Sequence, residues 1–378
     1  MGKKILITAT ELHLIQFWTE HIKGLIENSN TVDIVCSNIG GRLEELKKRL
    51  RECGNPRLNV VSLQRSPSSP KNLLGYFQLR KYFKENDYDV VITNEPVMGV
   101  MTRLAARTVR KRGAKVIYFA HGFHFWKGAP FLNWALFYPI EKIGSHFADV
   151  IVTMNSEDYA LAKRHFNCAE IKYTYGIGID LSEFVFDEKT RKEKRKSLNI
   201  NDDEFVFFSA AELSTRKNLI LALQIVKRMH DKGFKVRYFV RGTGPLEDKL
   251  KEYITENKLE NIVSLMGYGK DIKEMCLAAD AFLFTSKQEG LPAAVMEAMS
   301  CNLPCLASDI RGVNDLIQNG KGGFVCRLND VDGFCEKAQI LIENNNEDFK
   351  GRLTQSNREV LLPYSRENVF SFISGLIE

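Results

Sequence analysis

The sequence contains no long hydrophobic run. No stretch of its 378 residues approaches the roughly 18 uninterrupted apolar residues of a membrane span. The apolar stretch at residues 5–7, which follows two lysines, is also too short for the hydrophobic part of a secretory signal peptide. These absences predict a protein that stays in the cytoplasm.

Motifs that would define other kinds of site are missing as well. The eight cysteines are scattered and only Cys301 and Cys305 lie close together, so their spacing is not that of a zinc site. We expect them to be small buried side chains in a reducing compartment. Gly242 and Gly244 follow a predicted strand, but the third glycine and the downstream acid of a dinucleotide-binding fingerprint are absent. The position of the two glycines still suits a close approach of backbone and nucleotide.

Charge is unevenly divided along a chain whose length suggests about two domains of roughly 150–200 residues each. Residues 1–180 hold 25 Lys and Arg against 17 Asp and Glu, a net charge of +8, whereas residues 181–378 hold 28 against 30, a net charge of −2. The first half therefore favours an anionic partner. No nucleic-acid-binding module is evident, so an anionic membrane surface or a diphosphate-linked acceptor is the better hypothesis.

Strand and helix patterns alternate in both halves of the chain. In the first half, short apolar runs alternate with helix-period stretches, among them a helix predicted at residues 42–51 and another at 99–112. A second series begins with the strand at residues 205–210, after a charged run at 187–196. This alternation predicts an α/β fold with parallel sheets, helices on both faces and ligand sites at the carboxyl ends of the strands. We place the domain boundary near residue 180.

One strand–loop–helix unit has the features of an anion site. Residues 281–285 are an apolar run typical of a buried parallel strand, and Pro292 stands where proline is favoured, at the first turn of a helix. The backbone N–H groups of Gly290 and Leu291 would gather at this helix N-terminus, where anions bind. A phosphate is the expected ligand.

Two glutamates flank this site. Glu289 lies in the loop, and Glu297 lies about five helical residues further on, roughly 7.5 Å along the axis. A nucleotide sugar, which has hydroxyls on both sides of a diphosphate, would fit this arrangement. The alternative is that such acids only compensate the helix dipole, as caps commonly do.

Two cations stand at the start of another predicted helix. Arg216 and Lys217 follow the strand at residues 205–210 and precede a helix that runs to about Lys232. Basic groups oppose the dipole at a helix start, so they require a nearby anion. A phosphate of the same ligand would supply it.

The first half offers one candidate of its own. His121 follows the predicted strand at residues 115–119 and precedes Gly122, which leaves room for a ligand. The alternative is a histidine whose hydrogen bonds are satisfied by the loop backbone.

These motifs together resemble the retaining glycosyltransferases of family 4, which have the GT-B fold. The resemblance lies in the Glu-x7-Glu pattern with Glu-Gly-Leu-Pro at residues 289–292, and in residues 303–308 and 310–312. Residues 120–130 and 175–180 resemble the branch that builds bacterial capsular polysaccharides and exopolysaccharides. The resemblance implies an acceptor-binding Rossmann-like domain at residues 1–180, a nucleotide-sugar-binding one at 181–362, and a last helix at 363–378 that returns to the first domain.

The resemblance also implies roles for the candidate residues. Glu289 would hold hydroxyls of the transferred sugar, Glu297 the ribose hydroxyls, and Lys217 the leaving phosphate. His121 would lie on the acceptor side. The candidate catalytic residues are therefore Glu289, His121 and Lys217, and the candidate residues for binding the sugar donor are Arg216, Lys217, Gly242, Gly244, Glu289, Gly290, Leu291, Pro292 and Glu297.

The sequence departs from the family pattern at two places. Glu212 stands where the family usually has an arginine, and Arg216 is the candidate to supply the missing charge. Residues 8–11 replace the glycine-rich turn that often follows the first strand. The Asp-x-Asp of metal-dependent transferases is absent from the predicted cleft, so we expect that no metal is required.

The predicted function is transfer of a hexose or acetamido-hexose from a nucleoside diphosphate, UDP in the first place, to a lipid-linked (polyprenyl diphosphate) or saccharide acceptor. One alternative is a glycosidase, which needs two carboxylates facing each other across one bond. The other is a GT-B-like protein that binds a nucleotide sugar without turning it over. The aromatic stretch at residues 123–138, with Trp126 and Phe131, is either core or a segment that dips into the inner face of the cell membrane.

Overall fold

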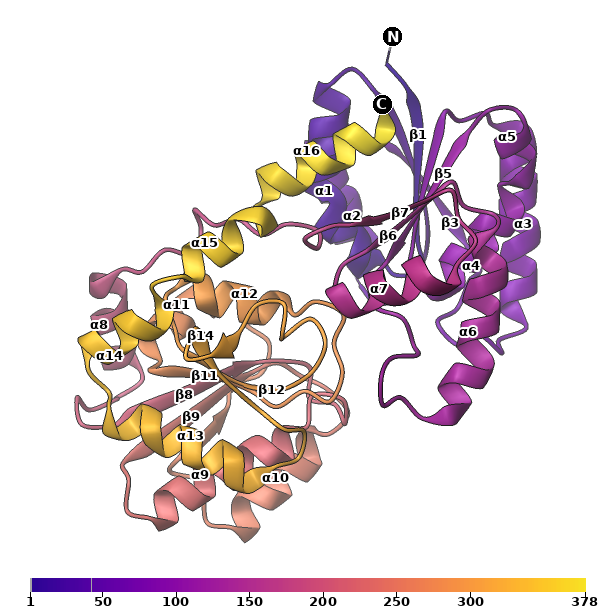
Figure 1. Cartoon of the computed structure of the whole chain (residues 1–378). Helices are drawn as coiled ribbons and strands as arrows, with labels where there is room; N and C mark the ends of the chain where they lie inside the picture. Colours follow the sequence, from indigo (N-terminus) through magenta and orange to yellow (C-terminus); the bar gives the residue numbers. More distant parts are fainter. Residues whose placement is uncertain (1, 42) are drawn as a thin grey trace. The chain divides into compact units, whose positions relative to one another are not determined.

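Two parallel sheets organise the part of the chain that the structure, a computed structural model, describes (Figure 1). The described residues are 2–41 and 43–378. The chain divides into unit 1, which comprises Met1–Gly178 and Glu367–Glu378, and unit 2, which comprises Ile179–Arg366. This fold is the predicted α/β architecture.

Unit 1 is built on a seven-stranded sheet of order β3-β2-β1-β4-β5-β6-β7, in which every neighbouring pair is parallel. Its strands are β1 (Lys4–Ala9), β2 (Thr31–Ser37), β3 (Arg57–Val61), β4 (Val90–Asn94), β5 (Lys115–Ala120), β6 (Val150–Thr153) and β7 (Glu170–Tyr173). Its helices are α1 (Leu12–Glu27), α2 (Leu43–Glu52), α3 (Lys71–Glu85), α4 (Pro96–Ala105), α5 (Arg107–Lys111), α6 (Phe131–Ser145), α7 (Ser156–His165) and α16 (Arg366–Ile377).

Unit 2 repeats this plan with the order β10-β9-β8-β11-β12-β14-β13, again parallel throughout. Its strands are β8 (Phe205–Ala210), β9 (Val236–Arg241), β10 (Val263–Leu265), β11 (Ala281–Phe284), β12 (Cys305–Ser308), β13 (Gln318–Asn319) and β14 (Gly322–Cys326). Its helices are α8 (Glu188–Ser197), α9 (Leu219–Asp231), α10 (Glu247–Glu256), α11 (Ile272–Ala278), α12 (Ala293–Ser300), α13 (Val331–Glu343), α14 (Glu347–Thr354), α15 (Asn357–Leu361) and the 3₁₀ turn η1 (Leu362–Tyr364).

Both sheets reverse their strand order near the middle, and this position determines where ligands can bind. In unit 1 the reversal lies between β1 and β4, and in unit 2 it lies between β8 and β11. The loops that leave neighbouring strands at such a point diverge to opposite faces of the sheet and leave a crevice at the carboxyl ends. We therefore expect a site in the segments that follow β1, β4, β8 and β11.

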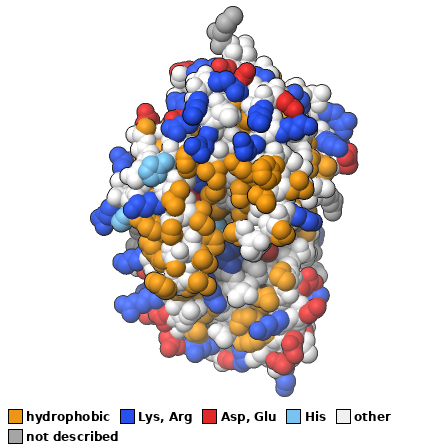
Figure 2. All heavy atoms as spheres, turned by 90° about the vertical axis from the view of Figure 1, so that its right-hand side faces the viewer, with side chains coloured by type: hydrophobic (Ala, Val, Ile, Leu, Met, Phe, Trp, Pro, Cys, Tyr) orange, Lys and Arg blue, Asp and Glu red, His pale blue; other side chains and the backbone are white. Residues whose placement is uncertain are grey.

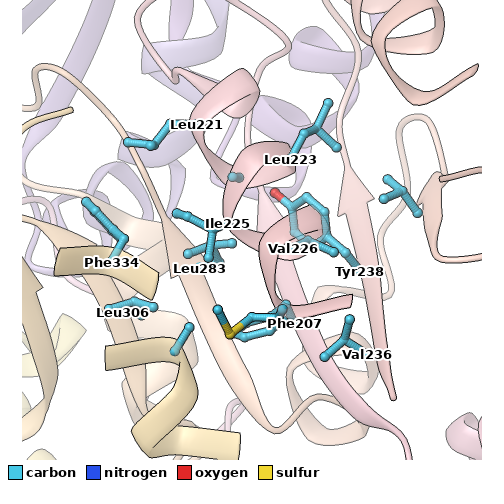
Figure 3. Packing of buried hydrophobic residues seen from close by; sticks show 14 of the residues in the cluster. Phe207, Leu221, Leu223, Ile225, Val226, Val236, Tyr238, Leu283, Leu306 and Phe334 are labelled. Carbon is cyan, nitrogen blue, oxygen red and sulfur yellow. The ribbon is translucent and has the colours of Figure 1, made fainter. Parts of the chain in front are cut away.

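The strands of unit 2 are apolar on both faces, as parallel strands covered by helices require. Phe207 of β8 packs with Leu221 and Ile225 of α9 on one face, together with Tyr238 and Phe334 (Figure 3). The next residue of the strand, Phe208, belongs to the cluster on the opposite face. This double burial fixes β8 and the loop that follows it.

Several predicted boundaries shift. The helix predicted at residues 99–112 is two helices, α4 and α5, and α4 begins earlier because Pro96 occupies its first turn. The helix predicted to start at residue 42 is α2, and residue 42 itself lies outside the described residues. Pro292 caps α12 one residue before the helix begins, rather than lying in its first turn.

The last helix, α16, packs on α1 within unit 1. Phe370 stacks on His21 of α1, and Lys115 and Lys3 donate to the carbonyl oxygens of Leu376 and Ile377. Basic side chains at a helix C-terminus complete its unpaired carbonyls and complement its dipole. The ammonium groups thus hold the end of the chain on the first sheet.

Two predictions from composition are also answered. Seven of the eight cysteines are buried, and the eighth, Cys168, is half-buried. Over residues 2–41 and 43–378, we find no helix with the length and apolar character needed to cross a membrane.

Candidate active site

Glu289 is the centre of a charge cluster in unit 2. It lies in the loop between β11 and α12 and is only 8% exposed. One carboxylate oxygen accepts from Nζ of Lys217 at 2.7 Å and the other from Nη1 of Arg216 at 2.8 Å. Two cations thus converge on one buried carboxylate, and the negative charge of Glu212 also acts on Lys217.

The two cations come from the loop after β8, which is joined to the loop after β11. The backbone N–H of Lys287 donates to the carbonyl oxygen of Arg216 at 2.8 Å. The hydroxyl of Thr285 donates to the carbonyl oxygens of Lys217 and Asn218 at 3.2 and 3.1 Å. The strand reversal therefore places the cations and the glutamate together, although about 70 residues separate them in the sequence.

Lys217 is more deeply placed than Arg216. The side chain of Lys217 is 12% exposed and that of Arg216 is 43% exposed. Burial lowers the pKa of the Lys217 ammonium below its usual value, and the Glu289 carboxylate opposes this shift. A further anion beside Lys217 would stabilise its charged form.

Arg216, rather than Glu212, supplies the second positive charge of this cluster. The side chain of Glu212 belongs to an exposed residue of the same loop, whereas the guanidinium of Arg216 reaches Glu289 and also the carbonyl oxygen of Gln288 at 3.2 Å. The cluster thus has a second cation, supplied by a neighbouring position of the loop.

A second loop supports Glu289 from behind. Nε of the buried Arg311 donates to the carbonyl oxygen of Glu289 at 3.0 Å. Gly312 has a φ of +75°, and a Cβ there would lie 2.2 Å from the carbonyl oxygen of Gly290. Only glycine permits this approach, so Arg311 and Gly312 together fix the loop that carries Glu289 and Gly290.

Glu297 lies on α12, the helix that follows Leu291 and Pro292. Burial raises the pKa of its carboxyl to about 7, and the negative charge of Glu183 adds to the effect. A carboxyl with this pKa is divided between its two forms at neutral pH, and a ligand that donates hydrogen bonds to it would favour the carboxylate.

The two glycines after β9, Gly242 and Gly244, are required by close packing against another part of the backbone. A Cβ on Gly242 would lie 1.8 Å from the carbonyl oxygen of Ala211, and one on Gly244 would lie 2.6 Å from that of Leu213. The loop that carries Arg216 and Lys217 therefore packs directly on this backbone. Contact of either glycine with a nucleotide stays a prediction.

His121 lies in unit 1, at the carboxyl end of β5. Its Nε2 is 2.9 Å from Oδ1 of Asn94, whose own amide nitrogen donates to the carbonyl oxygen of Thr8. Burial lowers the pKa of His121 to about 4, so the ring is neutral at pH 7. Because Oδ1 of Asn94 must accept, the proton is on Nε2 and the other ring nitrogen, Nδ1, is the acceptor. The partner of His121 is thus a side chain rather than the loop backbone of the alternative hypothesis.

Glu95, at the strand reversal of unit 1, was not predicted as a site residue. Its φ of 64° and ψ of 159° fall in a region that is essentially restricted to glycine. Its carboxylate accepts from the backbone N–H groups of Thr10 and Glu11 at 2.5 and 3.2 Å. Burial, and then the charge of Glu11, raise its pKa to about 7. The turn after β1, which lacks the family's glycines, is thus held by Glu95, which follows β4, the strand beside β1 in the sheet.

Two buried serines of unit 2 were also not predicted as site residues. Ser286 follows β11 and Ser308 ends β12, and both are buried. Neither hydroxyl oxygen has a hydrogen-bond partner among the described residues. The signal that could have found Ser286, Ser308, Asn94 and Glu95 is the same, namely a polar residue at or just after the carboxyl end of a buried parallel strand. Within the described part of the chain, no group of three or more His, Cys, Asp or Glu side chains is placed to hold a metal ion.

Comparison with protein families explains this arrangement. The model described as Glycosyltransferase Family 4 matches residues 16–181, and the model described as Glycosyl transferases group 1 matches residues 190–360. The two matches cover most of units 1 and 2.

Relatives of similar length support the same assignment. The chain is 33% identical over 307 residues to a Bacillus subtilis protein described as glycosyltransferase EpsD, which covers 81% of this chain and 80% of the relative. It is 28% identical over 309 residues to an Escherichia coli UDP-Gal:alpha-D-GlcNAc-diphosphoundecaprenol alpha-1,3-galactosyltransferase, covering 80% and 78% of the two chains. The crystal structure of Anabaena HepE in complex with UDP and glucose superposes with a TM-score of 0.79 at 17% identity, covering 100% of this chain and 99% of that one.

The fold and the family matches define a glycosyltransferase with the GT-B fold. The chain belongs to the family 4 glycosyltransferases and is an enzyme of the kind found among bacterial exopolysaccharide glycosyltransferases. The resemblance predicted from the Glu-x7-Glu motif is confirmed.

Proposed function

We propose that the protein is a retaining glycosyltransferase that moves a hexose or acetamido-hexose from a UDP-linked donor to a lipid-linked acceptor, a sugar on a polyprenyl diphosphate. The product would enter a capsular polysaccharide, an exopolysaccharide or an O-antigen. The proposal is supported by the names of two similar proteins, one with a UDP-galactose donor and a diphosphoundecaprenol-linked acceptor, the other crystallised with UDP and glucose.

One observation carries the proposal, namely that Arg216 and Lys217 converge on Glu289 at the strand reversal of unit 2. A diphosphate placed beside Arg216 and Lys217 would accept charge-assisted hydrogen bonds from both cations. The Glu289 carboxylate can then turn its acceptor oxygens towards sugar hydroxyls, and Glu297 can accept from the ribose. Each of these is a charge-assisted hydrogen bond.

The transfer that we propose asks little covalent chemistry of the protein. The bond between the anomeric carbon and the diphosphate oxygen breaks, and the acceptor hydroxyl oxygen forms a new bond to the same face of that carbon. The proton of the hydroxyl goes to the departing diphosphate. Lys217 and Arg216 stabilise the charge that grows on this leaving group, which is the type of interaction that lowers a barrier most.

The acceptor belongs to unit 1 in this proposal. His121 is neutral at pH 7, and its Nδ1 can accept a hydrogen bond from the acceptor hydroxyl and orient it. A neutral ring suits an uncharged sugar hydroxyl. We also propose that no metal ion takes part, so that a chelator should leave the rate of transfer unchanged.

A panel of nucleotide sugars tests the donor. We expect one UDP-sugar to raise the melting temperature, since a ligand at 100 times its Kd adds about 2.7 kcal/mol to the free energy of unfolding. Transfer to a lipid-diphosphate sugar, followed by NMR of the product, should show the same anomeric configuration as in the donor. An inverted product would contradict the retaining mechanism.

The same assays separate the alternatives. Donor binding without transfer to any lipid-linked acceptor would favour a non-catalytic binding protein. Hydrolysis of a simple aryl glycoside without a nucleotide would favour a glycosidase. The ion pairs of Glu289 with two cations argue against the latter, because a glycosidase needs its carboxylates directed at one bond.

A further inference from the structure

Helix α6 exposes most of its large aliphatic side chains. Phe131 is 85% exposed, and four further apolar residues along the helix are also exposed: Leu132, Leu136, Ile140 and Ile143. The last four follow one another at intervals of three or four residues, so they form a continuous stripe on one side of the helix. In a helix that only covers a sheet, this side would be polar.

The neighbouring helices extend the stripe into a surface. α4 contacts both α6 and α3, and an apolar groove lies between α4 and α6, lined among others by Val97, Val100 and Phe137. On α3, Leu73, Leu74 and Phe77 are exposed. Figure 2, which looks onto the side of Figure 1 where α3 and α6 lie, shows a broad group of hydrophobic side chains with Lys and Arg side chains at its margin. We use the name apolar surface for the exposed apolar side chains of α3 and α6 together with the half-buried Val97 and Val100 of α4.

This surface differs from the aromatic segment singled out in the sequence. Phe123 and Phe125 are buried and stack on each other in the core of unit 1, and Trp134 and Tyr138 pack against them. Those aromatic side chains are therefore core. The exposed face of the segment is mainly aliphatic and lies on the opposite side of α6, which the hydrophobic content of the sequence alone could not separate from the core side.

The exposed charges on helices α3, α5 and α6 are almost all positive. On α3, α5 and α6, all of whose residues the structure describes, the exposed charged side chains are one carboxylate, Glu85, and seven cations: Lys71, Arg80, Lys81, Lys84, Arg107, Lys111 and Lys142. Along α3, Leu73, Phe77, Lys81 and Lys84 follow the helical repeat, so the apolar and basic positions share one face. The buried Glu141 is neutralised by Arg103 at 2.7 Å.

We propose that the apolar surface docks onto a lipid bilayer with anionic headgroups. Lysines at the margin, five of the seven cations, point to lipid rather than protein, because protein interfaces are depleted of lysine. Apolar side chains on helices that lie flat, surrounded by lysine and arginine, are the arrangement that binds reversibly to an anionic membrane surface. This inference deepens the proposed function and rests on it, since a polyprenyl-linked acceptor is held in that bilayer.

Sedimentation of the full chain with vesicles tests the proposal. Phosphatidylcholine vesicles with about one third phosphatidylglycerol should carry down the wild type, and pure phosphatidylcholine should carry down much less. Added salt should weaken the binding, because it screens the lysines. The Leu136→Glu/Ile140→Glu variant should bind at least tenfold more weakly, whereas Phe17→Glu, which places one carboxylate at an exposed apolar position on α1, should bind like the wild type.

A second variant tests the charges independently. Lys81→Ser/Lys84→Ser keeps the apolar stripe of α6 intact, and we expect weaker binding at low salt together with a smaller dependence on salt. Melting temperatures and affinity for the UDP-sugar, measured on both variants, should match the wild type. A variant that loses vesicle binding but keeps donor affinity separates this proposal from the proposed function.

Three outcomes would overturn the proposal. One is a wild type that does not sediment with anionic vesicles, and another is binding that the Leu136→Glu/Ile140→Glu change leaves intact. The third is a dimer, detected by light scattering, that the same change converts to a monomer while vesicle binding stays absent. In that case the surface would bind a second copy of the chain.

Discussion

The two units use one architecture for opposite electrostatic purposes. Both have a seven-stranded parallel sheet whose strand order reverses near the middle. In unit 2 the cations and Glu289 follow the two strands at the reversal, whereas in unit 1 Glu95 follows β4 at the reversal and His121 follows β5, the neighbouring strand. In unit 2 these residues form ion pairs, with Arg216 and Lys217 on Glu289. In unit 1, burial lowers the pKa of His121 to about 4 and raises that of Glu95 to about 7. Unit 2 pairs opposite charges at these positions, whereas the surroundings of His121 and Glu95 in unit 1 favour their neutral forms.

This difference fits the two halves of a nucleotide sugar transfer. A diphosphate requires fixed cations, and they are most effective where water is largely excluded. An acceptor hydroxyl is neutral and needs hydrogen-bond partners that are neutral as well. The strand order therefore determines where each site lies, and the residues at the strand ends determine which ligand each site can take.

The largest effect should come from removing the buried cation of unit 2. Lys217→Ala should lower kcat by about 10²–10³-fold, because the ammonium stabilises charge that grows in the transition state. Affinity for the donor should fall much less. Steady-state kinetics with a UDP-sugar would separate the two quantities.

Arg216→Ala is the matched control, since its side chain pairs with the same carboxylate but is more exposed. We expect a smaller loss. If Lys217→Ala were fully active and Arg216→Ala inactive, the leaving-group role would pass to Arg216.

The next effect concerns the neutral site. His121→Ala should leave UDP binding intact and reduce transfer by about 10²-fold, the scale on which a misplaced reacting group lowers the rate. His230→Ala, which removes an exposed histidine of unit 2, should change neither. A melting temperature many degrees lower with normal transfer would show that His121 only packs.

Glu297 tests whether the charge of unit 2 depends on pH. Glu297→Gln should weaken binding of a UDP-sugar at pH 8 by about 1.5–3 kcal/mol, the value of a hydrogen bond to a charged group. Its pKa of about 7 means that the carboxylate disappears as the pH falls, so wild-type affinity should drop between pH 8 and pH 5.5. Calorimetry of the variant should show little dependence on pH in this range. An unchanged affinity in the variant would rule out contact with the ribose.

The sequence predicted the fold well, and it singled out the candidate residues of unit 2, because both follow from local patterns. Apolar runs of the length of β8 and β11 specify buried parallel strands, and the motif around Glu289 and Glu297 is continuous in the sequence. The pairing of Lys217 with Glu289 follows from the strand reversal, which no local sequence pattern shows.

The residues of unit 1 were harder to predict because their environment is made by distant segments. Asn94 forms a hydrogen bond with His121, and Glu95 accepts from the turn after β1. No sequence motif predicts either contact. The same holds for the exposed side of α6. Its aliphatic stripe and its core-facing aromatics are equally hydrophobic, and only the packing of Phe125 shows which side is buried.

The smallest effect is expected from Glu95→Gln. The sign of the change in the free energy of unfolding shows whether the Glu95 carboxyl favours its neutral or its charged form. The pKa of Glu95 is raised in the folded protein, so the folded state binds a proton more tightly than the unfolded state between about pH 4.5 and pH 7. The free energy of unfolding should therefore decrease as the pH rises through this window. Glutamine cannot ionise, so the variant should match the wild type at pH 5 and exceed it at pH 8, by about 1 kcal/mol once the weaker bonds to the N–H groups of Thr10 and Glu11 are taken into account. Urea unfolding at the two pH values measures the difference. A variant less stable than the wild type at pH 8 would mean that the carboxylate is charged and stabilising, and that unit 1 also keeps an anion at its strand ends.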